Sequence, residues 1–269
     1  MINQVKLSSY NNRKTFKYGV EIPRNWKDAV RLDKLNGNTL WADAVKYERE
    51  CVDEFDVFFD CKFTIPKGYK KIRVHFVFDC KHDGRRRARL VADGHLTDVP
   101  VESVYSGVVS LRGIRIMTFL AEHNKIELWA TDIGSAYLQT YTKEKLYIQA
   151  GPEFQELEGH YLIIVRALYG LRTSGARWHE RFADCLKAEG FFPCRAEPDI
   201  WMRKNGEIYE YIGVYVDDLA LALKEPEAFI NTLMKKYKFK FKGTGPIEFH
   251  LGLNFIRDDD GTLRLEPKK

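Results

Sequence analysis

The most informative pattern of apolar and polar positions runs from residue 208 to residue 223. Apolar and aromatic residues precede and follow two adjacent carboxylates, Asp217 and Asp218. Aromatic and β-branched residues on both sides favour strands, and the short acidic connection favours a β-hairpin. Two charges at the tip of a buried hairpin are costly unless they are paired or bound to a metal. A solvated turn, in which the two Asp residues only break the strand, fits the pattern about equally well.

The same periodicities predict the other elements of the chain. Apolar residues at helical spacing predict helices over 26–55, with a break near 36–38, and over 102–122, 175–188 and 225–238. Alternating or short apolar runs predict strands over 69–79, 85–92, 126–132, 146–148 and 161–165, a strand from residue 199, and a closing β ribbon over 246–265. The sequence therefore predicts an α+β fold.

The predicted hairpin over 69–92 is strongly basic. Arg85, Arg86, Arg87 and Arg89 lie near its tip and along one arm. The planar guanidinium can donate two hydrogen bonds at once, which suits phosphate. A basic edge strand that discourages sheet-to-sheet aggregation is an equally good interpretation of these arginines alone.

A third carboxylate ends the predicted strand over 126–132. Asp132 is followed by Gly134, which permits close approach of another group to the main chain. Taken alone, Asp132 is better interpreted as the cap of a short helix that begins near Ser135.

Composition limits the class of protein. The 269 residues are 45% hydrophobic and 13% aromatic, which is typical of a globular chain with a sizeable core. The net charge of +5 permits a polyanionic partner without requiring one. No apolar run reaches the roughly 20 residues of a membrane span, and no signal peptide is recognisable. The five cysteines lack paired spacing, which favours a reducing intracellular location and argues against a zinc site.

Adjacent strands would bring the three carboxylates together. Asp132, Asp217 and Asp218 then form the arrangement that holds two divalent ions about 4 Å apart. Phosphoryl transfer needs little covalent chemistry from the protein, so carboxylates and phosphate-binding arginines suffice.

An ordered set of motifs resembles one family. Tyr215-Val216-Asp217-Asp218 resembles the YxDD (here YVDD) motif of reverse transcriptases, and Asp132-Ile-Gly-Ser-Ala-Tyr137 resembles their first catalytic-aspartate motif. Further stretches resemble the polymerase of Copia-type (Pseudoviridae) long-terminal-repeat retrotransposons: 88–92, 105–109, 167–172, 198–201 and 249–252. The resemblance runs from about Trp26 to Phe255, in order. It implies a right-hand polymerase fingers–palm fold with a ferredoxin-like antiparallel palm sheet.

The resemblance also implies roles for individual residues. Asp132, Asp217 and Asp218 would be catalytic and, with the main-chain carbonyl of Ile133, would bind two Mg²⁺ ions, or Mn²⁺ in their place. Tyr137 would exclude the ribose 2′-OH from the nucleotide site.

The remaining implied roles concern nucleotide and nucleic acid. The incoming triphosphate would contact Arg89, with Lys81 or Arg87 as a second contact. Gly170 would lie along the nucleotide, and the residues facing template and primer would be Arg87, Arg172, Tyr215 and Val216. Three positions depart from the usual pattern: Asp93 replaces a basic residue, Gly175 a proline, and 105–107 a Phe-Ala-Pro-like segment.

The resemblance places the domains and partners as follows. We expect a leader over 1–25, fingers over 26–122, a palm over 123–224, and the end of the palm over 225–269 with the thumb largely absent. The implied partners are a primed RNA or DNA template, deoxynucleoside triphosphates, and the integrase and RNase H regions of a polyprotein. The implied location is intracellular, in a cytoplasmic virus-like particle or the nucleus, with no membrane.

The resulting expectation is an RNA-directed DNA polymerase that takes part in transposition. Its rivals are an element fragment that binds nucleic acid without synthesis, a DNA-templated or primer-independent polymerase on the same palm, and a structural protein without ligand.

Overall fold

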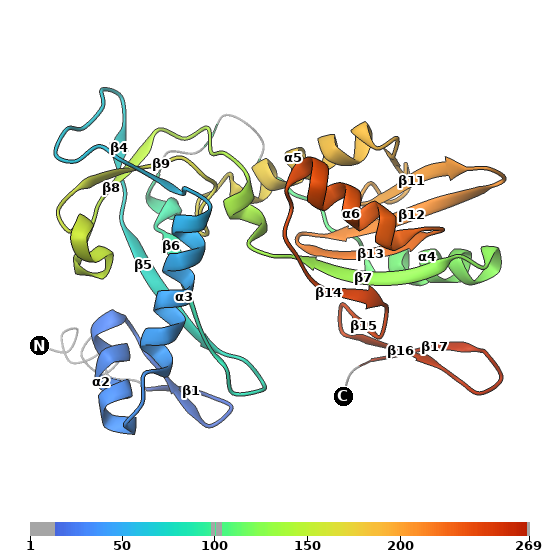
Figure 1. Cartoon of the computed structure of the whole chain (residues 1–269), viewed down its shortest axis with the longest axis horizontal. Coiled ribbons are helices and arrows are strands. Elements are labelled where there is room, and N and C mark those ends of the chain that lie inside the picture. Colours follow the sequence, from blue (N-terminus) through green and yellow to red (C-terminus); the bar gives the residue numbers. More distant parts are fainter. Residues whose placement is uncertain (1–13, 98–99, 101–103, 268–269) are drawn as a thin grey trace, which may run out of the picture. The chain divides into compact units, whose positions relative to one another are not determined.

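The computed structural model describes residues 14–97, 100 and 104–267. The chain divides into two compact units (Figure 1). The first unit comprises Met1–Val99 and Tyr141–Ser174, and the second comprises Pro100–Thr140 and Gly175–Lys269. The predicted leader, fingers and palm were consecutive segments. In the structure, by contrast, the first unit also includes residues 141–174, which follow the strand of Asp132 in the sequence.

The first unit combines two helices with short sheets. Its helices are α2 (Trp26–Asn36) and α3 (Leu40–Glu54), with 3₁₀ turns η1 (Gly94–Leu96) and η3 (Pro152–Leu157). Its strands are β1 (Thr15–Lys17), β2 (Val20–Ile22), β3 (Phe58–Asp60), β4 (Lys70–Lys71), β5 (Val74–Cys80), β6 (Arg86–Ala92), β8 (Leu146–Gln149) and β9 (Tyr161–Ile164). They form the β1–β2 and β5–β6 hairpins and a sheet in the order β3-β9-β8-β4.

Several sequence predictions for this unit are confirmed and two need correction. The two-helix region breaks where predicted, at Gly37, whose φ of +63° ends α2. The strand predicted over 69–79 is in fact two strands, β4 and β5, in different sheets. Residues 1–13 of the predicted leader lie outside the described residues, whereas 15–22 form a hairpin.

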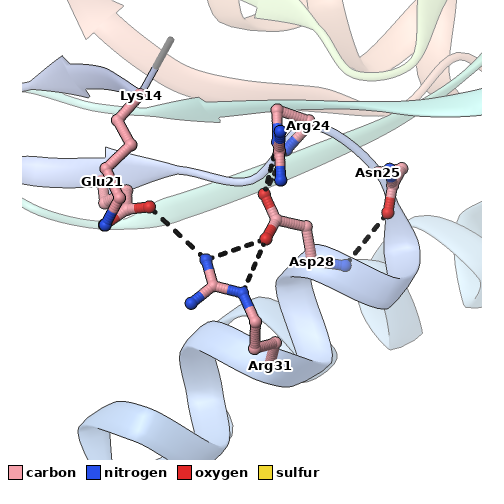
Figure 2. A network of polar contacts seen from close by, with 6 residues as sticks. All are labelled: Lys14, Glu21, Arg24, Asn25, Asp28 and Arg31. Carbon is pink, nitrogen blue, oxygen red and sulfur yellow. Dashed lines mark hydrogen bonds and ion pairs between the residues drawn. The ribbon is translucent and has the colours of Figure 1, made fainter. Parts of the chain in front are cut away.

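Charged side chains fix the start of α2 (Figure 2). Asn25 caps the helix by accepting from the Asp28 main-chain nitrogen at 3.0 Å. The buried Asp28 carboxylate accepts from Arg24 Nε at 3.1 Å and from Arg31 Nε at 2.9 Å. Burial acts to raise the pKa of Asp28, but the hydrogen bonds from Arg24 and Arg31 outweigh it, so the pKa is lowered. The carboxylate is therefore charged and paired at neutral pH.

The second unit contains the sheet that carries the three carboxylates. Its helices are α4 (Leu111–Asn124), α5 (Ser174–Ala188, whose first residue belongs to the first unit) and α6 (Pro226–Tyr237), with the 3₁₀ turn η2 (Ala136–Gln139). Its strands are β7 (Glu127–Ile133), β10 (Phe192–Pro193), β11 (Ile200–Asn205), β12 (Ile208–Tyr215), β13 (Asp218–Leu223), β14 (Phe241–Pro246), β15 (Phe249–His250), β16 (Leu253–Arg257) and β17 (Leu263–Pro267). An antiparallel sheet has the order β10-β11-β12-β13-β7-β14, and β15-β16-β17 form a smaller one.

Both faces of the six-stranded sheet are covered. Side chains alternate along β13: Leu219, Leu221 and Leu223 join a core with α5 and α6, whereas Ala220 and Ala222 join a core with α4. Small residues on the second face let α4 approach closely, since a Cβ on Gly213 would lie 3.0 Å from Ile114 Cδ1. The structure is thus α+β, as predicted.

Helix α4 begins later than the sequence predicted. The expected helix covered 102–122, but α4 begins after Ser110, whose hydroxyl accepts from the Gly113 main-chain nitrogen at 3.0 Å. Before it, the Val109 nitrogen donates to the Val214 carbonyl at 2.8 Å, so this segment pairs with β12 and not with a helical turn. Residues 101–103 of the expected helix lie outside the described residues. No described helix has the length and apolar character needed to cross a bilayer.

Candidate active site

The β12–β13 hairpin presents the two adjacent carboxylates. Tyr215 pairs with Asp218 across a two-residue loop of Val216 and Asp217. Val216 has φ of +57°, a conformation that β-branched residues rarely adopt. The Val216 carbonyl accepts a hydrogen bond from Trp178 Nε1 at 2.7 Å.

The third carboxylate lies on the neighbouring strand. Asp132 of β7 is directly opposite Asp218 of β13, and side chains opposite each other on antiparallel strands have Cβ atoms about 4.5–5.5 Å apart. The Ile133 main-chain nitrogen donates to the Asp217 carbonyl at 2.8 Å. The backbone therefore brings Asp132, Asp217 and Asp218 to one end of the sheet, and all three are partly buried.

The donor set suits a hard divalent cation, although the side chains do not converge fully. Among the residues that the structure describes, no group of three or more His, Cys, Asp or Glu is arranged to hold a metal ion. Carboxylate oxygens are nevertheless the ligands that Mg²⁺ prefers. The opposed pair, Asp132 and Asp218, fits such an ion, and Asp217 lies in the adjoining turn. Lys242 of β14 pairs with Asp132 on the other side of β7 and adds a positive charge at this end of the sheet.

The loop after β7 is held by main-chain contacts and positions Tyr137. The Gly134 nitrogen donates to the Lys240 carbonyl at 2.8 Å, and Gln139 Nε2 donates to the Gly134 carbonyl at 2.6 Å. Tyr137 packs partly against the core that includes α5. A Cβ on Gly175, where the family pattern has a proline, would lie 3.8 Å from the Tyr137 hydroxyl, which is an ordinary van der Waals contact.

In the first unit, the predicted phosphate-binding arginines lie on β6. Arg87 and Arg89 are two residues apart and therefore project to the same side of the strand. The Arg89 guanidinium lies over the Tyr169 ring at 5.1 Å, and its buried Nε has no hydrogen-bond partner. Lys81 is exposed in the β5–β6 turn.

A buried acid lies near these two arginines. Glu48 of α3 accepts from the Leu90 main-chain nitrogen at 2.9 Å. Burial raises the pKa of Glu48, and the nearby charges of Arg89 and Arg87 oppose this effect. Glu48 thus supports β6 from the side of α3, a role that the sequence did not indicate.

The predicted nucleotide loop, residues 167–172, is bound to the end of β6. The Ala92 nitrogen donates to the Tyr169 carbonyl at 2.7 Å. Gly170 has φ of +88°, and a Cβ there would lie 2.2 Å from the Ala92 oxygen. Arg172 donates from Nε to the Gly94 carbonyl at 3.0 Å and from Nη2 to the His95 carbonyl at 2.9 Å. Arg172 thus uses two of its donors to hold the chain beyond β6.

Asp93, which departs from the family pattern, is neutralised within the first unit. It is 9% exposed. Its carboxylate lies 3.2 Å from Arg73 Nε and 3.1 Å from His75 Nδ1. Its negative charge is therefore largely compensated by neighbours.

Sequence reasoning missed two residues that hold these loops. Trp178 falls within the helix predicted over 175–188, but a sequence does not reveal where an indole N–H points. Gly94 was not singled out, yet a Cβ there would lie 2.2 Å from the Gly170 oxygen. Its position after the basic strand was the only available signal.

Comparisons with known proteins agree on one family. The family model described as "Reverse transcriptase (RNA-dependent DNA polymerase)" matches residues 61–268. The chain is 26% identical over 211 residues to the retrovirus-related Pol polyprotein from transposon TNT 1-94 of Nicotiana tabacum, covering 72% of this chain and 15% of that protein. It is 32% identical over 196 residues to the transposon Ty1-DR5 Gag-Pol polyprotein of Saccharomyces cerevisiae, covering 71% of this chain and 11% of that one. The chain thus spans only a small part of these relatives.

A solved structure is also similar, at lower identity. It is a foamy viral protease-reverse transcriptase in complex with double-stranded DNA, with a TM-score of 0.43 and 15% identity. The match covers 78% of this chain and 33% of that one.

Proposed function

The chain belongs to the reverse transcriptase (RNA-dependent DNA polymerase) family, and we propose that it adds deoxynucleotides to a primer 3′-OH on an RNA or DNA template. Its sequence is similar to part of the polyproteins of Copia-type retrotransposons. The observation that carries the proposal is the pairing of Asp132 with Asp218 across β7 and β13, with Asp217 in the adjoining turn. A sheet end with three carboxylates on neighbouring strands is suited to divalent cations and triphosphate.

The proposal gives each residue of the candidate site a defined role. Asp132 and Asp217 would hold the divalent ions, with Asp218 supporting the site. When bound, the ions lower the pKa of the attacking hydroxyl and neutralise charge on the phosphates. Tyr137 would contact the sugar of the nucleotide.

The basic strand of the first unit would serve the triphosphate. Arg89 projects from β6, and its guanidinium lies over the Tyr169 ring, 5.1 Å from the ring centroid. An arginine held in this way loses little conformational freedom when it donates to phosphate oxygens. Arg87, on the same side of β6, would make a second contact with phosphate.

Primer extension tests the proposal. The 269-residue chain would be incubated with Mg²⁺, deoxynucleoside triphosphates and primed RNA or DNA templates. We expect extension on both templates and a loss of at least about a hundredfold, or ~2.7 kcal/mol, in Asp217→Asn. The control is Asp259→Asn, the same chemical change at an exposed position of the β16–β17 turn, which should retain extension. Equal activity in wild type and Asp217→Asn would contradict the assignment.

One observation favours a second candidate, nucleic-acid binding without synthesis. The three carboxylates do not form a three-ligand group among the described residues. Under this alternative, wild type and Asp217→Asn would bind primed template equally, and neither would extend it. Measuring binding and extension on the same preparation separates the two candidates.

A further inference from the structure

We propose that Trp178 is a positioning residue for the carboxylate turn, acting through its indole N–H on the Val216 carbonyl. The bond joins α5 to the turn between β12 and β13 at 2.7 Å. Trp178 does not contact the carboxylates in this role; it restrains the main chain that carries Asp217. The kinetic part of the inference rests on the proposed function, whereas the structural part does not.

The restraint matters because the turn is unfavourable for its sequence. Val216 has φ of +57°, and Asp217 has no positive φ. A two-residue hairpin loop with positive φ only at its first position is the pattern of a type II′ turn, where glycine is the preferred residue. A β-branched residue in that conformation persists only when its surroundings hold it there.

Two hydrogen bonds hold the turn from different elements. The Asp217 carbonyl accepts from the Ile133 nitrogen of β7 at 2.8 Å, and the Val216 carbonyl accepts from Trp178 of α5. The first bond links the turn to the strand of Asp132. The second is the one that bears directly on the residue with unfavourable φ.

The indole is itself held firmly. Trp178 is 1% exposed. Its ring stacks on Phe182 with centroids 5.5 Å apart and meets Phe239 edge-on at 5.5 Å. A donor with so little freedom fixes its acceptor more tightly than a surface side chain would, because little conformational entropy remains to be lost.

The contact between Trp178 and Val216 borders a small pocket. The pocket is lined by Trp178, Val216, Val214 and His179, among other residues. The hydrogen bond from Trp178 spans one side of this pocket and reaches the turn. Loss of the N–H would release the Val216 carbonyl and let the turn relax, which would displace Asp217 and Asp218.

The test removes the donor and keeps a smaller aromatic ring. Trp178→Phe lacks the N–H, and Phe182→Leu serves as the matched control because it weakens the same aromatic cluster but leaves the donor. Val216→Gly combined with Trp178→Phe is the rescue, since glycine adopts the turn without help. All variants are measured well below their melting temperatures.

Hydrogen exchange at the Ile133 amide, followed by NMR, reports on the turn whether or not the protein is active. We expect Trp178→Phe to speed this exchange about tenfold or more through local opening, Phe182→Leu to change it less than about twofold, and the double variant to recover most of the protection. Unchanged exchange in Trp178→Phe, or equal acceleration in Phe182→Leu, would overturn the inference.

Steady-state extension adds the kinetic readout. In an active wild type we expect Trp178→Phe to lower kcat about tenfold or more with the KM for primed template within about twofold, because a small displacement of catalytic groups affects the chemical step most. A kcat within about twofold of wild type would also overturn the inference. An inactive wild type would defeat the proposed function alone, leaving the exchange result to decide the role of Trp178.

Discussion

At the scale of single residues, close main-chain contacts hold the loops that flank the candidate site. Neither Gly94 nor Gly170 has space for a Cβ: on Gly94 it would lie 2.2 Å from the Gly170 oxygen, and on Gly170 it would lie 2.2 Å from the Ala92 oxygen. The loop 167–172 therefore has a structural reason for its glycine that is independent of any nucleotide. The glycine is thus required by the folding of the loop, whether or not the loop binds a nucleotide.

We expect Gly170→Ala to destabilise the protein by about 2–4 kcal/mol, because it adds a clash with Ala92 to an unfavourable φ. Gly68→Ala is the matched control: Gly68 has nearly the same φ, +86°, but nothing lies within 4 Å of the added Cβ. The control should cost only about 1–2 kcal/mol. Urea unfolding of both variants measures the difference, and equal losses would contradict the clash.

His250 makes stability depend on pH. It is 5% exposed, its Nε2 has no hydrogen-bond partner, and burial lowers its pKa from 6.5 to about 4. The unfolded chain therefore binds the proton more readily. Stability should be full above pH 6.5 and fall toward pH 4, by up to about 1.4 kcal/mol per pH unit.

The variant His250→Leu tests this directly. It should flatten the part of the stability–pH curve between 6.5 and 4, since leucine does not titrate there. Urea midpoints at several pH values provide the measurement. A curve of the same slope in the variant would assign the effect to other groups.

At the scale of elements, the sequence predicted most of what a local periodicity can encode. The β12–β13 and β5–β6 hairpins and the break between α2 and α3 follow from alternation and glycine positions. Strand β14 was missed because Phe241–Pro246 contains two glycines, a lysine and a proline, and gives no alternating pattern at the sheet edge. The return of 141–174 to the first unit and the bond from Trp178 to Val216 depend on tertiary packing, which no local pattern reports.

An ion pair between a buried carboxylate and a partly exposed guanidinium joins two strands at the other end of the sheet from the three carboxylates. Arg203 of β11 and Glu210 of β12 are directly opposite. Arg203 Nη2 lies 2.7 Å from the Glu210 carboxylate, which is 2% exposed and also accepts from the Lys224 nitrogen at 2.9 Å. Burial alone would raise the pKa of Glu210, but these hydrogen bonds outweigh it and lower the pKa.

We expect Arg203→Met to cost about 3–5 kcal/mol, because it leaves a buried carboxylate without its charge partner. Adding Glu210→Leu should recover part of the loss, although the Lys224 nitrogen then loses its acceptor. Thermal unfolding of the single and double variants tests the coupling. Additive losses would show that the pair does not act as a unit.

At the scale of the whole molecule, the excess of positive charge could act on a polyanion in two ways, through long-range attraction or through specific phosphate contacts. A net charge of +5 would attract a polyanion at long range, but salt screens such attraction beyond about 8 Å at physiological ionic strength. Specific phosphate contacts have a different signature. Each neutralised phosphate contributes about −0.7 to −0.9 to the slope of log affinity against log salt.

Two substitutions of equal charge separate these effects. Lys81→Gln removes an exposed cation from the turn of the basic hairpin, and Lys235→Gln removes one from the exposed side of α6. If the hairpin contacts phosphate, Lys81→Gln should make the salt slope shallower by about 0.9 for primed duplex, or about 0.7 for a single strand. Lys235→Gln should leave the slope unchanged, because it alters only the long-range field. Fluorescence anisotropy between 50 and 200 mM salt, roughly the range over which such slopes are resolved, measures both variants. Equal slopes in the two variants would mean that net charge, and not the hairpin, accounts for the affinity.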